Sequence, residues 1–153
     1  MRTGKPSNRS SGSAYLLLLL LLSSLTMAAS QGVRLGEASQ RFEAERALIQ
    51  IGMTYQRALK SYAQHGGGYP PTLNDLLRDP RTPGIVRHLR RLQSDPLCGC
   101  PWGVLRNESG GIIAVFSQAR GTPLRQIGWE PELAHFDDAR SYADWEFGFR
   151  RRP

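Results

Sequence analysis

The sequence predicts an α+β fold in which a long N-terminal helix packs on a small antiparallel β-sheet. Three observations lead to this prediction: a leucine run that opens a long proline-free stretch, apolar residues at helical spacing after it, and two β-type runs joined by a turn in the second half. At 153 residues the chain is about one domain long. We therefore expect a single folded body after the N-terminal segment.

The N-terminal segment combines a basic leader with an apolar run. Arg2, Lys5 and Arg9 precede a stretch over residues 14–29 that is predominantly apolar. This pattern is typical of a targeting segment whose leader stays in the cytoplasm while the rest of the chain is exported. Residues 14–29 would span about 24 Å as a helix, so we expect residues 31–35 to complete a transmembrane span. The leucines expected to form the membrane or filament core are Leu16, Leu17, Leu18, Leu19, Leu20, Leu21 and Leu22.

Two cleavage sites are open for this segment. A cut before Gln31, after the small residues 28–30, would remove the leucines as an ordinary signal peptide. A cut between Gly12 and Ser13 would keep them.

The helix is predicted to continue beyond the leucines with one buried stripe. Apolar residues recur at steps of three or four within each of two groups, and charged residues occupy the opposite face. On that face we expect Arg41 and Glu45 to interact at i,i+4 spacing. Glycine and proline in residues 66–71 end the helix near residue 64. The stripe consists of Leu35, Ala38, Phe42, Leu48, Ile51, Tyr55, Leu59 and Tyr62.

Two short helices and a sheet are predicted after the glycine tract. The first helix lies within residues 71–77, with Thr72 as N-cap and Asp75 in the capping-box position, and the second covers residues 85–92. Residues 102–106 and 111–117 form two extended runs around a four-residue turn at 107–110, which predicts an antiparallel hairpin. An aromatic-rich last strand over residues 142–149 is expected to close the sheet.

The net charge of the chain is +7, but it is concentrated at the two ends. Residues 31–149 hold 14 basic and 13 acidic side chains, so a basic binding surface in the folded body has to be local. Arg87, Arg90 and Arg91 form the one candidate patch. No aromatic stacking platform is interleaved with it, which argues against nucleic acid as a partner.

The spacing of Cys98 and Cys100, one glycine apart, leaves several interpretations open. An exported location favours a disulfide, although a single intervening residue makes the ring tight. Two thiol ligands of a metal site, bridges to other molecules, or a turn that merely contains two cysteines are the alternatives. Structural zinc needs four ligands, and no histidine stands at finger spacing, so we predict no metal.

Enzymatic chemistry is not indicated by any motif. Ser117 lacks the G-x-S-x-G context of a nucleophile elbow, and no glycine-rich loop carries a lysine for phosphate. Asp137, Asp138 and Asp144 offer loosely placed oxygens, whereas calcium needs six or more ligands. We therefore predict no catalytic residue and no cofactor, with calcium as the alternative kept open.

The order of short motifs along residues 12–149 resembles the type IV pilin and type II secretion pseudopilin family, particularly its major-pseudopilin-like members. The resemblance rests on the basic leader ending in Gly12, the apolar helix, and the motifs at residues 68–77, 87–92, 95–96, 102–104, 111–117 and 142–145. Family members usually carry phenylalanine and glutamate where this chain has Ser13 and Leu17.

The resemblance implies a pilin-like structural subunit rather than an enzyme. A prepilin peptidase would cut between Gly12 and Ser13, and the leucine helix, embedded in the inner membrane as a single pass, would later enter a periplasmic filament that helps to export folded proteins. Its implied partners are other pilin-like subunits, the inner-membrane assembly platform, prepilin peptidase and membrane lipid. The expected organisation is a leader at 1–12, a membrane or filament-core segment at 13–35, a periplasmic head at 36–149 with the sheet at 102–149, and a basic tail at 150–153.

Two alternative functions stay open. One is a soluble periplasmic or secreted binding protein with a cleaved signal peptide. The other is a minor pilin that handles DNA with Arg87, Arg90, Arg91 and the arginine tail.

Overall fold

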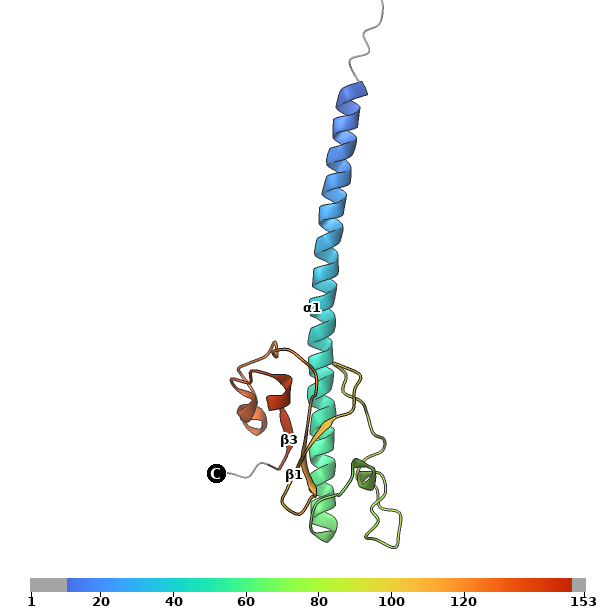
Figure 1. The fold of residues 1–153 in the computed structure, drawn as a ribbon, viewed down its shortest axis with the longest axis vertical. Helices are drawn as coiled ribbons and strands as arrows, with labels where there is room; N and C mark the ends of the chain where they lie inside the picture. Colours follow the sequence, from blue (N-terminus) through green and yellow to red (C-terminus); the bar gives the residue numbers. More distant parts are fainter. Residues whose placement is uncertain (1–10, 150–153) are drawn as a thin grey trace, which may run out of the picture. The chain divides into compact units, whose positions relative to one another are not determined.

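The computed structural model describes residues 11–149, apart from the side chains of residues 11 and 26–38. Two compact units meet inside the first helix, with the boundary between Gln40 and Arg41. Residues 1–10 of the predicted leader at 1–12, the predicted tail at 150–153, and the side chains of Leu35 and Ala38 in the predicted stripe lie outside the described residues. In chain order the elements are α1 (Ser11–Gly66), η1 (Leu73–Leu76), β1 (Gly103–Arg106), β2 (Ile112–Phe116), η2 (Pro131–Phe136), η3 (Tyr142–Asp144) and β3 (Glu146–Gly148), as labelled in part in Figure 1.

The first unit corrects the predicted fold class and localisation. The structure is α+β with a small antiparallel sheet, but no helix in its described part is long and apolar enough to cross a membrane. The membrane-embedded first half of the helix and the single-pass inner-membrane localisation are therefore wrong. The physical reason is polarity: Ser23 and Ser24 interrupt the apolar run of residues 14–22, which covers about 14 Å of helix, against a hydrocarbon core of about 30 Å.

In the second unit, the 41–66 part of α1 buries most of the predicted stripe. Leu48, Tyr55, Leu59 and Tyr62 are almost completely buried. Phe42 is 50% exposed, so the stripe begins later than predicted. Glycine ends the helix as predicted: Gly67 has a φ of 69°, and its N–H still donates to the carbonyl of Ala63 at 3.1 Å.

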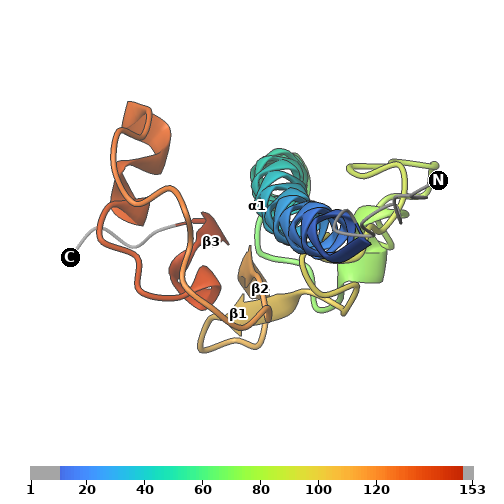
Figure 2. The same cartoon turned by 90° about the horizontal axis from the view of Figure 1, so that it is seen from above.

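The sheet has the strand order β1-β2-β3, with both pairs antiparallel. The predicted hairpin is confirmed, with Val104 opposite Val115 and a register shift between Leu105 and Arg106. The predicted last strand is shorter than expected, because Ser141 caps a 3₁₀ turn at Tyr142–Asp144 and leaves Glu146–Gly148 to pair with β2. Figure 2 shows the three strands beside α1.

The two predicted short helices have different outcomes. The first is confirmed as η1, where the Thr72 N–H donates to Asp75 Oδ2 at 2.9 Å. The second, over residues 85–92, is wrong, because the backbone there bonds elsewhere. The N–H groups of His88 and Leu89 both donate to the carbonyl of Leu76 at 2.9 Å, so they are not available to a local helix.

The core lies between α1 and the sheet and continues beneath the C-terminal loops. Phe147 on β3 packs against Gly52 of α1, where a Cβ atom would collide with the phenyl ring. Trp145 and Phe136 stack at 5.5 Å between ring centroids, and both are fully buried. A glycine on the helix and aromatic residues after the sheet hairpin therefore set the distance between helix and sheet.

Candidate interaction sites

The leucine segment presents apolar side chains on all sides of α1. Exposed fractions run from 50% at Leu19 to 69% at Leu25, and Leu17, Leu18 and Leu21 lie between these values. Leu16, Leu20 and Leu22 are exposed as well. Such a helix, apolar around its whole circumference, is stable when other apolar groups cover it.

The predicted cleavage site, Gly12 and Ser13, lies in the first turn of α1. A Cβ atom at Gly12 would meet nothing within 4 Å, so a larger residue would fit there. No described side chain outside the helix lies against this glycine.

Cys98 and Cys100 are joined by a disulfide with 5.1 Å between their Cα atoms. Asp95, which is fully buried, holds this loop: its backbone bonds to Gly99 and to Cys100, and its carboxylate accepts from Leu97 N at 2.8 Å and Ser117 Oγ at 2.5 Å. Asp95 and the two sulfur atoms lie within 4.8 Å of one another. A zinc ion would need the sulfurs as thiolates, which the disulfide does not provide.

The three acidic residues considered for calcium are not gathered into one cluster in the described part of the chain. The Asp144 carboxylate instead caps η3, where it accepts from Arg140 N at 2.9 Å and Ser141 N at 2.8 Å. Asp137 follows the end of η2, and Asp138 has a φ of 62°. The position of the Asp144 carboxylate is therefore explained by helix capping.

A buried carboxylate network that sequence reasoning missed closes the end of α1. Asp79 is 1% exposed and binds Arg81 through both carboxylate oxygens, at 2.9 and 2.7 Å. Arg81 also donates to the carbonyls of Tyr62 and Gly67, and its guanidinium lies 3.6 Å from the centre of the Tyr62 ring. The hydrogen bonds from Arg81 hold the pKa of Asp79 well below its usual range. Arg81 thus supplies the donors that the last carbonyls of the helix require.

His88 joins this network on its other side. Its Nδ1 lies 2.8 Å from Ser61 Oγ, and its Nε2 lies 3.3 Å from Asp79 Oδ2. Serine, histidine and aspartate in this order suggest a hydrolytic triad. Both oxygens of Asp79 are, however, already bonded to Arg81, whose charge offsets the carboxylate that would have to stabilise an imidazolium. We infer that the hydrogen bonds of this group hold the 76–89 loop against α1.

A second buried carboxylate, Glu45, corrects the prediction that this residue lies on the exposed face of the helix, although it still interacts electrostatically with Arg41. Glu45 is 2% exposed, and its Oε1 accepts from Tyr142 Oη at 2.5 Å and from Leu124 N at 2.8 Å. Arg41 donates to the same tyrosine oxygen at 3.1 Å. Burial, and then the bond to Glu45, raise the pKa of Tyr142. Helical spacing placed Glu45 among charged neighbours, and no local signal revealed that Tyr142 would cover it.

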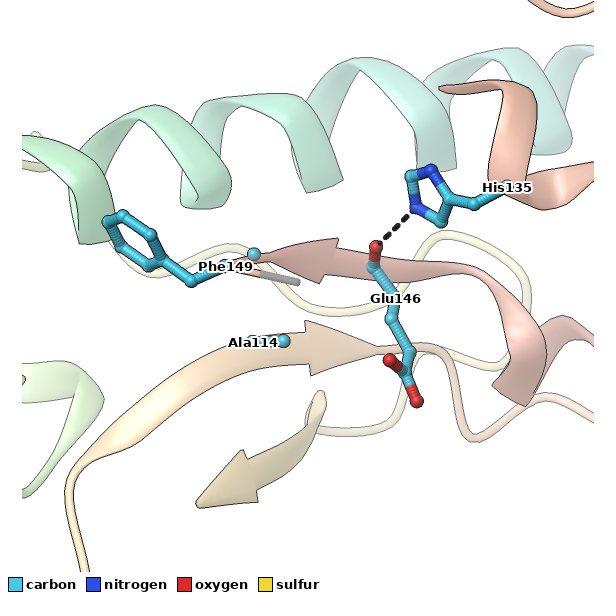
Figure 3. A pocket seen from close by; sticks show the side chains of 5 residues that line it. Ala114, His135, Glu146 and Phe149 are labelled. Atoms are coloured by element: carbon cyan, nitrogen blue, oxygen red, sulfur yellow. Dashed lines mark hydrogen bonds between the residues drawn. The ribbon is translucent and has the colours of Figure 1, made fainter. Parts of the chain in front are cut away.

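The cavity in Figure 3 is too small for a ligand. It is lined by Ala114, His135, Glu146, Gly148 and Phe149, with His135 Nε2 3.1 Å from the backbone oxygen of Glu146. Its volume of about 10 Å³ is the room that one water molecule occupies.

Two larger grooves flank α1 in the second unit. An apolar groove of about 180 Å³ is lined by Tyr55, Leu73, Leu92, Pro101 and Trp102, together with Gln93 and Ser94. The other groove, of about 300 Å³, is called the basic groove below. It is lined by Thr54, His88, Leu89, Arg90, Arg91 and Gln93, so two of the three arginines of the predicted patch lie on it.

Comparison with family models, with curated proteins and with solved structures finds no match to this chain.

Proposed function

We propose that this chain is a structural subunit of a filament of the pseudopilus or type IV pilus kind, which serves a type II secretion or similar export machine. The observation that carries the proposal is the leucine segment. Its side chains are at least half exposed around the whole helix in the described chain. Burying one such leucine contributes about 1.5–3 kcal/mol, so several copies of the segment gain a large free energy by packing together.

In this proposal, neighbouring copies supply the cover for the leucines. Apolar helices packed side by side form the filament interior, and the 41–149 units lie around it. The partners are other pilin-like subunits, the assembly platform and a prepilin peptidase that cuts between Gly12 and Ser13.

Mass spectrometry of the mature protein from cells tests the processing. We expect an N-terminus at Ser13, carrying a methyl group if the peptidase acts as it does in the resembling family. An N-terminus near Gln31 would show that the leucines had been cleaved off, and it would contradict the filament proposal.

A paired substitution tests the assembly. We expect the unaltered chain to form large assemblies in sedimentation and electron microscopy, and Leu18→Asp with Leu21→Asp to abolish them. The matched control is Ile85→Asp with Ile127→Asp, two exposed apolar residues of the second unit at 72% and 75%. Loss of assembly in the control alone, or in neither variant, would contradict the proposal.

A second candidate function is a secreted binding protein released by cleavage before Gln31. It is favoured by the hydrophobic core, which runs from Leu48 to Phe149 and lies within the second unit. The apolar groove that Leu73, Leu92 and Trp102 help to line would then be its ligand site. The same mass spectrum separates the two candidates.

A further inference from the structure

Charge is segregated within the second unit. Between residues 78 and 91 the chain carries five arginines and a single acidic residue, the buried Asp79. Between residues 130 and 138 it carries four acidic residues and no arginine or lysine. All four of these acidic side chains are exposed: Glu130, Glu132, Asp137 and Asp138, called the acidic segment below.

The basic groove has guanidinium groups that no carboxylate neutralises within the described chain. Arg90 and Arg91 line it and form no ion pair among the described residues. Arg57 adds a third cation, because its Nη2 lies 3.3 Å from Oγ1 of Thr54, another lining residue. The two acidic residues nearest in sequence, Asp79 and Asp95, are buried and bonded to other groups. The groove is therefore suited to carboxylates from outside this copy of the chain.

The two charged regions lie on opposite sides of the 41–66 part of α1. In Figures 1 and 2 the yellow-green loop that carries Arg87 to Arg91 lies on one side of the helix, and the orange-red segment with η2 lies on the other. They are thus unable to pair within one copy. Complementary patches on opposite sides of a molecule produce head-to-tail contacts, which extend into open arrays when the rotation does not close.

We propose that the basic groove of one copy binds the acidic segment of a second copy. This inference rests on the proposed function and assigns the contact between adjacent heads of the filament. Charge complementarity selects the occupant, since the same chain offers the carboxylates that the groove lacks. A nucleic-acid occupant is less well matched, because none of the groove residues is an aromatic side chain other than histidine, and that ring is held by Ser61 and Asp79.

Charge-reversal variants of the full chain test the contact by co-purification of two differently tagged copies. Arg90→Glu with Arg91→Glu, and separately Glu132→Lys with Asp137→Lys, should each weaken self-association by roughly tenfold or more. In both variants the association should depend much less on salt concentration than it does in the unaltered chain. The matched control for the arginine variant is Arg46→Glu with Arg120→Glu, which makes the same change of net charge at exposed sites elsewhere and should associate as the unaltered chain does.

Mixing the two test variants gives the sharper result. A copy with glutamates in its groove should bind a copy with lysines in its acidic segment, so association in the mixture should be stronger than that of either variant alone. Far-UV circular dichroism checks that each variant is folded. Undiminished association of both variants, equal loss in the control, or no recovery on mixing would overturn the proposal.

Three further outcomes distinguish the head contact from leucine packing and from nucleic-acid binding. If the charge variants assemble normally while Leu18→Asp with Leu21→Asp does not, the head contact is refuted and the filament proposal stands. If an N-terminus near Gln31 is found while mixing still restores association, the filament proposal fails and the head contact remains. A single-stranded oligonucleotide that binds the unaltered chain, and not the Arg90→Glu, Arg91→Glu variant, would assign the groove to nucleic acid instead.

Discussion

Two buried carboxylates connect α1, through hydrogen bonds, to loops that are far away in the sequence. Asp79 and Glu45 are at most 2% exposed, and both accept hydrogen bonds from named donors. Burying a charge is costly unless it is paired and hydrogen-bonded. Loss of one partner should therefore destabilise the fold more than loss of an exposed ion pair such as Glu43 and Arg46.

The bond between Asp79 and Arg81 should make stability depend on pH in the acid range. Because the pKa of Asp79 is lowered in the fold, its stabilisation is complete above the ordinary value of 3.8 and is lost as pH falls toward the folded pKa. At pH 7 we expect the free energy of unfolding of the Asp79→Asn variant to be lower than that of the unaltered chain. This difference in the free energy of unfolding should become smaller below about pH 4. Urea unfolding at pH 7 and pH 3 measures it, with Asp137→Asn as the control. A difference that is constant with pH would contradict the network.

Among the hydroxyl groups of residues 139–149, that of Tyr142 should contribute most to the free energy of unfolding. Tyr142→Phe removes the donor to Glu45 and the acceptor for Arg41 while keeping the ring. Leaving a buried carboxylate short of a partner costs about 1–3 kcal/mol. Chemical unfolding checks this value against Tyr69→Phe, because no hydrogen bond of the Tyr69 hydroxyl occurs in the described chain. Equal effects of the two substitutions would rule out the network as a source of stability.

At the scale of elements, the contact between α1 and β3 depends on one missing side chain. Gly52 lies against the ring of Phe147, and an added Cβ would overlap the ring atoms. We expect Gly52→Ala to destabilise the fold by about 1–3 kcal/mol through overpacking, although alanine favours the helix by up to about 1 kcal/mol. Thermal unfolding measures the net change in stability from these two opposing effects. Gly84→Ala is the control, because a Cβ there meets nothing within 4 Å; a stabilised Gly52→Ala variant would show that the sheet can move.

At the scale of the whole molecule, the second unit should fold without the leucine segment. Its hydrophobic core consists of residues between Leu48 and Phe149. A chain of residues 31–153 should therefore keep the near-UV circular dichroism and the urea midpoint of the full chain. A chain of residues 1–141, which lacks Tyr142, Trp145 and Phe147, should show no cooperative transition. Failure of the 31–153 chain to fold would mean that the first unit contributes to the core.

Local patterns were enough to predict several elements. The spacing of Leu48, Tyr55, Leu59 and Tyr62 predicted the buried face of α1, and Thr72 with Asp75 predicted the cap of η1. The turn at residues 107–110 predicted the hairpin and its pairing. These features depend on residues within a few positions of one another, so period and turn chemistry are sufficient to specify them.

Only the tertiary structure decided where the polar groups and loops go. The Leu76 carbonyl accepts from His88 and Leu89, which replaces the helix expected at residues 85–92. Tyr142 is 97 residues from Glu45, and the covering of that carboxylate follows from the packing of the C-terminal segment. The sequence by itself determined the helix stripe, the hairpin and the apolar character of residues 14–25. The burial of Glu45 and Asp79, and the separation of the basic groove from the acidic segment, depend on contacts between distant residues, which period and composition do not encode.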